Sequence, residues 1–462
     1  NNLGLVFFEL GKFENAIKYY HEAIEINSNN HDAIKNISIL FRQVGIDLFS
    51  GTDVERLRKL FLLLYKRNDI EHKDIFLNAK KILLAGKNYT ELKQIISFHK
   101  LLEKPTINNL MNDELFHLML QKSLITDDFF ETIITKIRRE ILSLLINSNL
   151  KTLEKKFEFI VSLAEQCFLN EYCFSQSNEE INWKNKLKIS IENNTKVNEL
   201  ELAILGCYTP LINSKYILNK LLKYKSENNL FNNLIDMHIK EPLKENSFIG
   251  SIKSLDVISD SVSQIVREQY EENPFPRWRY TYSKTSYNPL VIINNQINPN
   301  KIQLNDKFNR PKVLIAGCGT GKQIFIAQNY LNAKIIAVDL SKKSLAYAKR
   351  KAEESKIDNV EFLHADILKL NNLDKKFDII ECVGVLHHMK DPLKGLKVLL
   401  NLLEPQGFMK LGLYSDIARK DIEQARQLIV KKNYKSEFGD IVKFRQEIIR
   451  EKKYESLKKI SR

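Results

Sequence analysis

A regular alternation of short apolar strands and helical stretches, beginning at Pro311, constrains the fold of this chain most strongly. The strands read KVLIAG, AKIIAVDL, NVEFLHA, FDIIECVG and GFMKLGLY. Helical patterns such as KKSLAYAKRKAEESK and DPLKGLKVLLNLLEP lie between them. Because parallel strands need crossover connections, this rhythm predicts an α/β domain with a parallel sheet and helices on both faces.

The first of these strands ends in a glycine-rich loop, AGCGTGKQ, which contains Gly317, Gly319 and Gly321. A nucleotide-like ligand approaches the backbone at the carboxyl edge of such a strand, where side chains would block it. Dinucleotide-binding proteins also carry a glycine-rich loop there, but in their GxGxxG spacing the third glycine would stand at Lys322. The spacing therefore disfavours a nicotinamide-dependent oxidoreductase.

Two further strands end in a carboxylate. Asp339 closes the second strand in AVDLS, at the distance from the loop where a carboxylate accepts hydrogen bonds from both ribose hydroxyls. The alternative is a helix N-cap, a role that Ser341 could fill instead. Asp366 closes the third strand in HADI, where a carboxylate can accept a hydrogen bond from an adenine amino group.

The motifs AGCGTG, AVDLS, HADI and FDIIECVGVLHHMKDP, in this order and spacing, resemble class I S-adenosylmethionine-dependent methyltransferases over about residues 311–430. The resemblance implies a Rossmann-like domain with S-adenosylmethionine as its cofactor. The family usually has an acidic residue where this chain has Ile315, so its help in fixing the loop and the amino group is missing. The cofactor-binding residues that the resemblance implies are Gly317, Cys318, Gly319, Thr320, Gly321, Asp339, Leu340, Ala365, Asp366, Ile367, Cys382 and Val383.

A methyl group on a sulfonium is already electrophilic, so such an enzyme mainly aligns the reacting atoms and excludes water. An amine or hydroxyl acceptor can need a base to remove its proton. His387 and His388 follow the fourth strand, where this base would lie, and the order of the motif favours His387. The alternative is a loop histidine that shapes the pocket.

Residues 271–300 differ in composition from the rest, with EENPFPRWRYTYSKTSYNP rich in proline, aromatic residues and arginine. The two prolines around Phe275 exclude a continuous helix, which predicts a linker or a covering segment. Together with the repeats described next, this segment resembles bacterial repeat-containing methyltransferases of undetermined substrate. In that case Tyr270, Asn273, Arg277 and Trp278 would cover the cofactor or, with His388, face the substrate. The alternative is a linker whose Trp278 packs on the sheet edge.

The N-terminal 50 residues resemble the tetratricopeptide repeat, which has a 34-residue period. Small and aromatic residues stand at its spacing: Gly4, Phe7, Gly11 and Tyr20. The alternative is a generic amphipathic helix pair. Residues 51–255 show helical spacing of apolar residues with sparse proline and predict an α-helical array. Because helical repeats often bind peptides, a protein or peptide partner is expected.

The composition excludes several classes of protein. The net charge is +14, but 71 basic against 57 acidic residues make a mixed surface, so nucleic-acid binding is not expected. The five cysteines form no CxxC pair and have no histidine cluster beside them, which argues against a metal site and for a reducing, cytoplasmic compartment. No apolar run approaches the roughly 18 residues of a membrane span.

The predicted layout is therefore multidomain: a repeat over 1–50, a helical region over 51–255, a linker or covering segment over 256–300 and a methyltransferase domain over 301–462. The chain begins at Asn1 inside a helical pattern, and no strand hairpin follows GFMKLGLY, so truncation of both ends is expected. The predicted function is methyl transfer from S-adenosylmethionine to a small-molecule, lipid-like or protein acceptor. The alternative is an interaction scaffold whose methyltransferase fold is vestigial.

Overall fold

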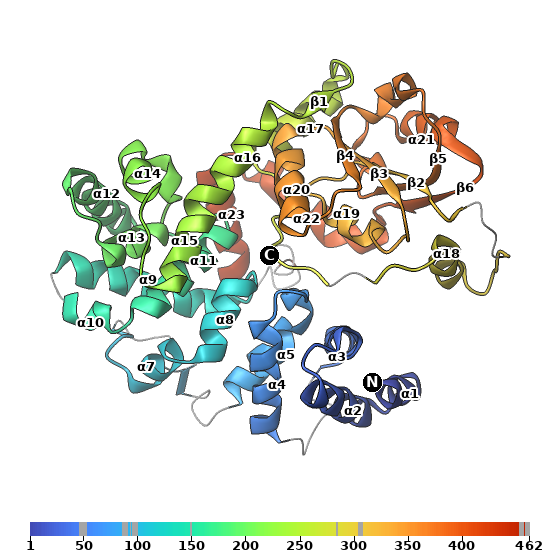
Figure 1. Ribbon diagram of the computed structural model, residues 1–462. Helices are drawn as coiled ribbons and strands as arrows, with labels where there is room; N and C mark the ends of the chain where they lie inside the picture. Colours follow the sequence, from blue (N-terminus) through green and yellow to red (C-terminus); the bar gives the residue numbers. More distant parts are fainter. Residues whose placement is uncertain are drawn as a thin grey trace. The chain divides into compact units, whose positions relative to one another are not determined.

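The chain packs into two compact units, of which Figure 1 shows the helices and strands. The first unit comprises Asn1–Lys240, Arg279–Ser283 and Asp421–Arg462, and the second comprises Glu241–Trp278 and Lys284–Lys420. The computed structural model describes residues 1–45, 53–85, 91–92, 94, 100–147, 150–282, 285–303, 308–451 and 457.

The first unit is built of helices. Several begin at a side-chain cap, such as Asp113 before α8 and Asp127 before α9, each of which accepts a hydrogen bond from a backbone N–H of the first turn. The helices are α1 (Asn2–Glu9), α2 (Phe13–Ile26), α3 (His31–Gln43), α4 (Val54–Lys66), α5 (His72–Leu84), α7 (Pro105–Met111), α8 (Glu114–Lys122), α9 (Asp128–Ile146), α10 (Leu150–Glu154), α11 (Phe157–Leu169), α12 (Asn178–Asn193), α13 (Glu199–Gly206), η2 (Leu211–Asn213), α14 (Lys215–Leu221), α15 (Asn229–Ile235), η3 (Asp236–Lys240), α22 (Lys420–Lys431) and α23 (Phe438–Arg450).

Helices α1 and α2 cross closely because a glycine faces an aromatic ring. A Cβ atom on Gly4 would stand 2.5 Å from the Tyr20 ring, and Tyr20 is itself buried. On α3 the buried Ser38 occupies the position 34 residues after Gly4, and Phe41 stands in the same relation to Phe7. Gly4 and Tyr20 of the predicted repeat therefore form a close contact between α1 and α2, whereas Gly11 lies exposed in the turn that joins them.

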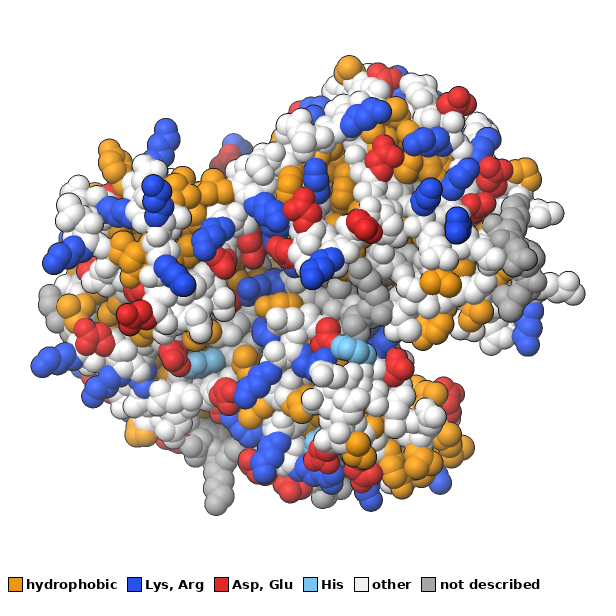
Figure 2. Space-filling view, viewed as in Figure 1, with side chains coloured by type: hydrophobic (Ala, Val, Ile, Leu, Met, Phe, Trp, Pro, Cys, Tyr) orange, Lys and Arg blue, Asp and Glu red, His pale blue; other side chains and the backbone are white. Residues whose placement is uncertain are grey.

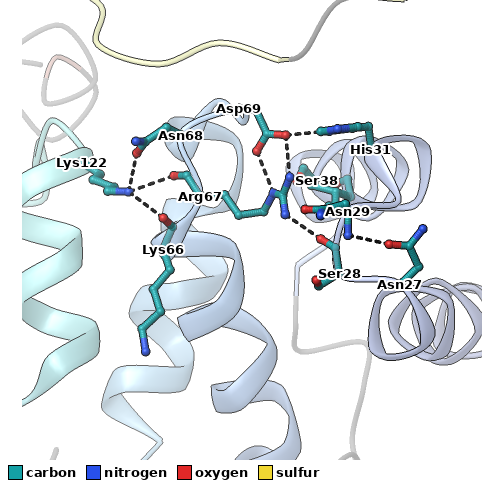
Figure 3. Close-up of polar contacts among 11 residues, drawn as sticks. Asn27, Ser28, Asn29, His31, Ser38, Lys66, Arg67, Asn68, Asp69 and Lys122 are labelled. Atoms are coloured by element: carbon teal, nitrogen blue, oxygen red, sulfur yellow. Dashed lines mark hydrogen bonds and ion pairs between the residues drawn. The ribbon is translucent and has the colours of Figure 1, made fainter.

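A polar network ties neighbouring helical turns of the first unit together (Figure 3). The Arg67 guanidinium donates two hydrogen bonds of 2.7 Å to the Asp69 carboxylate and one of 2.6 Å to the Ser28 carbonyl. Asp69 also contacts His31 at 2.7 Å, and Lys122 at the end of α8 donates to the Arg67 carbonyl at 2.9 Å. The ends of α2, α4 and α8 are thereby fixed to one another.

Two segments far along the chain also belong to the first unit. Arg279 donates to Glu165 at 2.7 Å, and the Tyr282 hydroxyl donates to Asp74 at 2.6 Å. Arg445 on α23 forms a bidentate ion pair with Glu131 of α9. These charge-assisted contacts bind residues 279–282 and α23 to helices that precede them by more than a hundred residues.

The second unit is a six-stranded parallel sheet with the strand order β1-β4-β3-β2-β5-β6 and helices around it (Figure 1). Its strands are β1 (Lys253–Ser254), β2 (Lys312–Ala316), β3 (Lys334–Asp339), β4 (Val360–His364), β5 (Phe377–Val383) and β6 (Leu403–Gly412). Its helices are α16 (Glu241–Ile249), α17 (Ser261–Glu272), α18 (Pro289–Ile297), α19 (Lys322–Ala327), α20 (Lys342–Glu354), η5 (Ile367–Leu373), η6 (Leu386–His388), α21 (Pro392–Leu402) and η7 (Ile417–Arg419).

Both faces of the central strands β2 and β5 are largely buried, as their continuous apolar sequences predict. Along β2, Val313 and Ile315 enter a core shared with α18, α19 and α20, whereas Leu314 and Ala316 enter a second core shared with η5 and α21. Alternate side chains of β2 thus pack into the cores on opposite faces of the sheet. The predicted fold class, an N-terminal helical region followed by a Rossmann-like domain, is confirmed.

The structure adds a strand and divides the chain at other residues than the sequence suggested. All five predicted strands are present, but β1 was missed because it has only two exposed residues and no apolar pattern. The segment 256–300 contains α17 and α18, and α16 already belongs to the second unit. The described residues from Asp421 onward pack with the first unit, and the boundary predicted between residues 50 and 51 lies outside the described residues.

Candidate active site

A cleft of about 420 Å³ opens at the carboxyl ends of the strands of the second unit. After β2 the chain adds β3 and β4 on one side of it, and then β5 and β6 on the other. The strand order thus reverses between β2 and β5, which is where open α/β sheets bind their ligands. The volume lies in the range of small-molecule sites.

Glycines in the loops after β2 and β5 serve two different purposes. Gly317 has φ +79°, and a Cβ atom on it would stand 2.3 Å from Cγ2 of Val385, so a side chain there would clash with the loop after β5. Gly384 in that second loop also has φ +79°, but a Cβ atom would meet nothing within 4 Å. The first glycine permits close packing, and the second leaves the cleft open.

Asp339 stands at the end of β3 and lines the cleft. Its carboxylate accepts hydrogen bonds from the N–H groups of Gly319, at 2.7 Å, and Ser341, at 2.9 Å. Burial raises its pKa to about 6, and Glu271 adds to the rise, whereas the two N–H donors oppose it. The predicted capping role falls to Ser341, whose hydroxyl accepts from the first turn of α20.

Asp366 stands at the end of the neighbouring strand β4 and also lines the cleft. One of its oxygens accepts a hydrogen bond from the Leu368 N–H at 2.9 Å, which fixes the side chain at the start of η5. Asp339 and Asp366 therefore present carboxylates at adjacent strand ends, beside a loop with little side-chain bulk. This set of groups fits a nucleoside, whose ribose hydroxyls and adenine amino group are hydrogen-bond donors.

Helix α17 and the residues after it form one wall of the cleft. Tyr270 lines it, together with Phe275 and Pro276. The Thr320 hydroxyl donates to the Pro276 carbonyl at 2.6 Å, and the Trp278 indole N–H donates to the Thr320 carbonyl at 3.1 Å. Two hydrogen bonds therefore attach this segment to the glycine-rich loop.

The other residues predicted to cover the site have different surroundings. Asn273 is exposed, and the Arg277 guanidinium lies 5.8 Å from the centre of the Tyr347 ring. Trp278 is 8% exposed and packs edge-on against Phe325 at 4.7 Å. Asn273, Arg277 and Trp278 are absent from the described lining of the cleft, so Trp278 acts as an anchor of the wall rather than as its surface.

The two histidines after β5 differ in position. His388 lines the cleft, whereas His387 is absent from the described lining. The His387 ring lies 3.6 Å from the centre of the Tyr414 ring, and Arg419 contacts the same tyrosine at 3.9 Å. Burial lowers the pKa of His387, and His388 and Arg419 lower it further. His387 therefore supports Tyr414, which itself lines the cleft.

Ten of the residues that the resemblance implied line the cleft, whereas Gly321 and Cys382 are absent from its described lining. Gly321 begins α19 against Ala348, and Cys382 is buried in the core beside α21, where burial raises the pKa of its thiol to about 12. The ten are Gly317, Cys318, Gly319, Thr320, Asp339, Leu340, Ala365, Asp366, Ile367 and Val383.

Eleven lining residues were not predicted. Lys322, Gln323, Gly384, Val385 and Met389 stand within the sequences AGCGTGKQ and FDIIECVGVLHHMKDP, but the resemblance assigns them no role. Phe275 and Pro276 stand within the aromatic, proline-rich segment, and Gln323 directly follows the glycine-rich loop, so composition could have drawn attention to them. The unpredicted lining residues are Ser263, Val266, Phe275, Pro276, Lys322, Gln323, Ile326, Gly384, Val385, Met389 and Tyr414.

Residues 308–444 match the family model of a methyltransferase domain, and residues 1–30 match that of the tetratricopeptide repeat. The chain joins a tetratricopeptide repeat to a methyltransferase domain. The match confirms the predicted class of this domain, a methyltransferase. It also confirms the predicted repeat at the N-terminus.

Several known proteins are similar to parts of the chain. An uncharacterised protein of Synechococcus is 32% identical over 184 residues, which is 37% of this chain and 41% of that protein. An uncharacterised protein of Rickettsia prowazekii is 30% identical over 141 residues, 30% of this chain and 54% of that protein. The structure of PKMT2 from Rickettsia typhi in complex with AdoHcy is 25% identical, with a TM-score of 0.30, and covers 37% of this chain and 33% of that one. The chain thus spans about half the length of these relatives or less.

The described part of the chain lacks two further features. None of its helices combines the length and the apolar character that crossing a membrane requires. Nor do its histidine, cysteine, aspartate and glutamate side chains gather in groups of three or more that could hold a metal ion. The five cysteines are free thiols, and burial raises the pKa of Cys318 beside the cleft well above its usual value.

Proposed function

We propose that this protein transfers the methyl group of S-adenosylmethionine to an acceptor that enters the cleft of the second unit. The observation that carries the proposal is the pair of carboxylates, Asp339 and Asp366, at adjacent strand ends beside the glycine-rich loop. The glycine-rich loop follows β2, which borders the point where the strand order reverses, in a unit that matches the methyltransferase domain family.

In this proposal each wall of the cleft has a separate task. Asp339 accepts hydrogen bonds from the ribose hydroxyls, and Asp366 accepts one from the adenine amino group. Bound S-adenosylmethionine supplies an electrophilic methyl group. Tyr270, Phe275 and Pro276 exclude water above it, so that the acceptor and the methyl group can be held in line.

We assign the proton-accepting role to His388 rather than to His387. A general base has to reach the proton that it removes, directly or through one water molecule. His388 lines the cleft, whereas both ring nitrogens of His387 are buried without a hydrogen-bond partner among the described residues. The assignment applies to an acceptor that loses a proton during the transfer.

The exchange of each histidine for asparagine separates these two roles. We expect His388→Asn to lower kcat about 100-fold or more while leaving the Kd of S-adenosylmethionine unchanged, because general-base catalysis contributes roughly 10²–10⁴. His387→Asn should lower kcat less, through loss of its contact with Tyr414. The assay is transfer of a radiolabelled methyl group to a panel of phenols, carboxylic acids, amines and lysine-containing peptides. A larger loss in His387→Asn than in His388→Asn would reverse the assignment.

The acceptor is not decided by the relatives, whose names point to different atoms. Partial matches of 27% identity over 188 residues and 27% over 153 residues carry the names tetrahydroprotoberberine N-methyltransferase and ubiquinone biosynthesis O-methyltransferase. These reactions belong to those proteins. The panel above therefore includes acceptors with both oxygen and nitrogen nucleophiles.

For the helical unit we propose a role in binding a protein or peptide partner. The tetratricopeptide match and the apolar surface of α1 support it, since Leu3, Val6 and Leu10 are each more than half exposed. Figure 2 shows hydrophobic side chains exposed over this end of the chain. Exposed apolar patches of this kind mark interaction sites in soluble proteins.

Calorimetric titration of the full chain tests the proposed function directly. Saturable binding of S-adenosylmethionine without any response to NADH supports it. A folded protein that binds neither compound would contradict it and favour an interaction scaffold with a vestigial methyltransferase fold.

A further inference from the structure

Gln323 is a polar side chain of the cleft that neither the motifs nor the proposed mechanism uses. It stands in the first turn of α19, directly after the glycine-rich loop, and lines the cleft. Its amide nitrogen donates to the Val383 carbonyl at the end of β5, at 3.3 Å. Its amide oxygen is buried and has no hydrogen-bond partner among the described residues.

A buried carbonyl oxygen without a partner is unfavourable, because it has lost water and gained no hydrogen bond. The bond to Val383 holds the carboxamide between β2 and β5, where the strand order reverses. A ligand that brings an N–H or O–H donor to this point would satisfy the oxygen. Gln323 therefore has the features of a ligand-binding residue.

The charges of the cleft indicate which donor this is. Of the described residues that line it, only Asp339 and Asp366 carry a carboxylate, and both stand at strand ends on the far side of the glycine-rich loop from β5. If these two hold the ribose and the adenine, the amino-acid end of S-adenosylmethionine extends toward β5. Its ammonium group then meets no carboxylate of the described lining.

We propose that Gln323 binds the ammonium group of S-adenosylmethionine through its amide oxygen. This proposal rests on the proposed function and assigns one further residue to the same site. The Val383 carbonyl orients the carboxamide, and the ammonium group supplies the missing hydrogen-bond donor. Recognition of the amino-acid end thus depends on a neutral amide rather than on an acidic side chain.

Truncated ligands test the assignment in the full chain by calorimetry. Gln323→Met removes the amide at nearly constant length and is expected to weaken S-adenosylmethionine binding about tenfold, since a hydrogen bond to a charged group is stronger than a neutral one. Binding of methylthioadenosine, which lacks the amino-acid end, should stay unchanged. Decarboxylated S-adenosylmethionine, which keeps the ammonium group, should lose as much as the parent compound.

Two further variants keep the test independent of folding. Gln323→Asn retains the amide but shortens its reach, and it should reproduce the loss. Gln328→Met makes the same exchange at the other end of α19, outside the described lining, and should bind all three ligands like the unchanged protein.

Three results would overturn the proposal. These are an unchanged affinity of Gln323→Met for S-adenosylmethionine, an equal loss for methylthioadenosine, and a loss that disappears with the decarboxylated ligand, which would assign Gln323 to the carboxylate. If the unchanged protein binds none of the three ligands, the proposed function fails and this inference fails with it. Ligand binding by the unchanged protein therefore distinguishes failure of the Gln323 assignment from failure of the proposed function.

Discussion

Replacing Asp339 by asparagine is expected to weaken binding of S-adenosylmethionine about 100-fold or more, because hydrogen bonds to a charged group contribute roughly 1.5–3 kcal/mol each and two ribose hydroxyls depend on this carboxylate. The exchange also turns an amide NH₂ toward one of two backbone donors, Gly319 or Ser341. The glycine-rich loop therefore loses one of its attachments as well. Calorimetric titration of the full chain measures the change.

The pH dependence of binding gives the same residue a second test. The pKa of Asp339 is raised to about 6, so the carboxylate is ionised at pH 7 and protonated at pH 5. A protonated carboxyl accepts fewer hydrogen bonds, so the affinity should fall as the pH drops below about 6. From pH 7 to pH 5 we expect the affinity for S-adenosylmethionine to fall about tenfold, because one pH unit below its pKa only about a tenth of the carboxyl groups stays ionised. Asp339→Asn should show a flat profile in this range.

A matched exchange elsewhere in the sheet serves as the control. Asp378 at the start of β5 accepts a hydrogen bond from the Lys312 N–H at 2.8 Å and is absent from the described lining of the cleft. Asp378→Asn should therefore leave both the affinity and its pH profile unchanged. An Asp339→Asn variant that binds as tightly as the unchanged protein would remove the ribose assignment.

Replacing Trp278 by alanine is expected to lower the unfolding free energy of the second unit by about 3–5 kcal/mol, the range for a buried tryptophan or phenylalanine. The indole packs against Phe325 and donates to Thr320, and the Trp278 carbonyl accepts from the Tyr347 hydroxyl at 2.5 Å. Urea denaturation of the full chain, followed by circular dichroism, measures the loss. The affinity for S-adenosylmethionine should fall as well, because Pro276 and Phe275 lose their anchor.

A second exchange separates the packing of Trp278 from its hydrogen bond. Trp278→Phe keeps an aromatic ring against Phe325 but loses the donor to Thr320, so we expect a smaller loss of stability, of about 1–3 kcal/mol. Trp183→Ala on α12 is the control, since it removes the other tryptophan of the chain and should leave cofactor affinity unchanged. An unchanged affinity in Trp278→Ala would show that the wall formed by residues 270–278 does not contribute to binding of the cofactor.

The sequence predicted those parts of the site that depend on local geometry. The glycine-rich loop, Asp339 and Asp366 each follow an apolar strand, and the ends of neighbouring parallel strands meet at one edge of a sheet. Their proximity therefore follows from strand order alone. Phe275 and Tyr414 could not be predicted in the same way, because Phe275 lies in the connection between β1 and β2 and Tyr414 follows β6.

Membership of a sequence motif did not decide which residues line the cleft. His387 and His388 are adjacent in the sequence, yet only His388 belongs to the described lining. The turn η6 directs the two rings differently, and the contact of His387 with Tyr414 depends on a residue 27 positions later. Cys382 likewise belongs to a predicted motif, but strand alternation places it in the core beside α21.

The sequence by itself determined the class of fold and the cofactor end of the site, because hydrophobic periodicity and glycine spacing act over a few residues. Only the tertiary structure decided which distant segments join each unit. Residues 279–282 and α23 return to the helical unit through Arg279 and Arg445, whose acidic partners lie more than a hundred residues earlier. No local pattern encodes such pairings, since the ion pairs depend on how whole helices pack and not on the residues beside them in the chain.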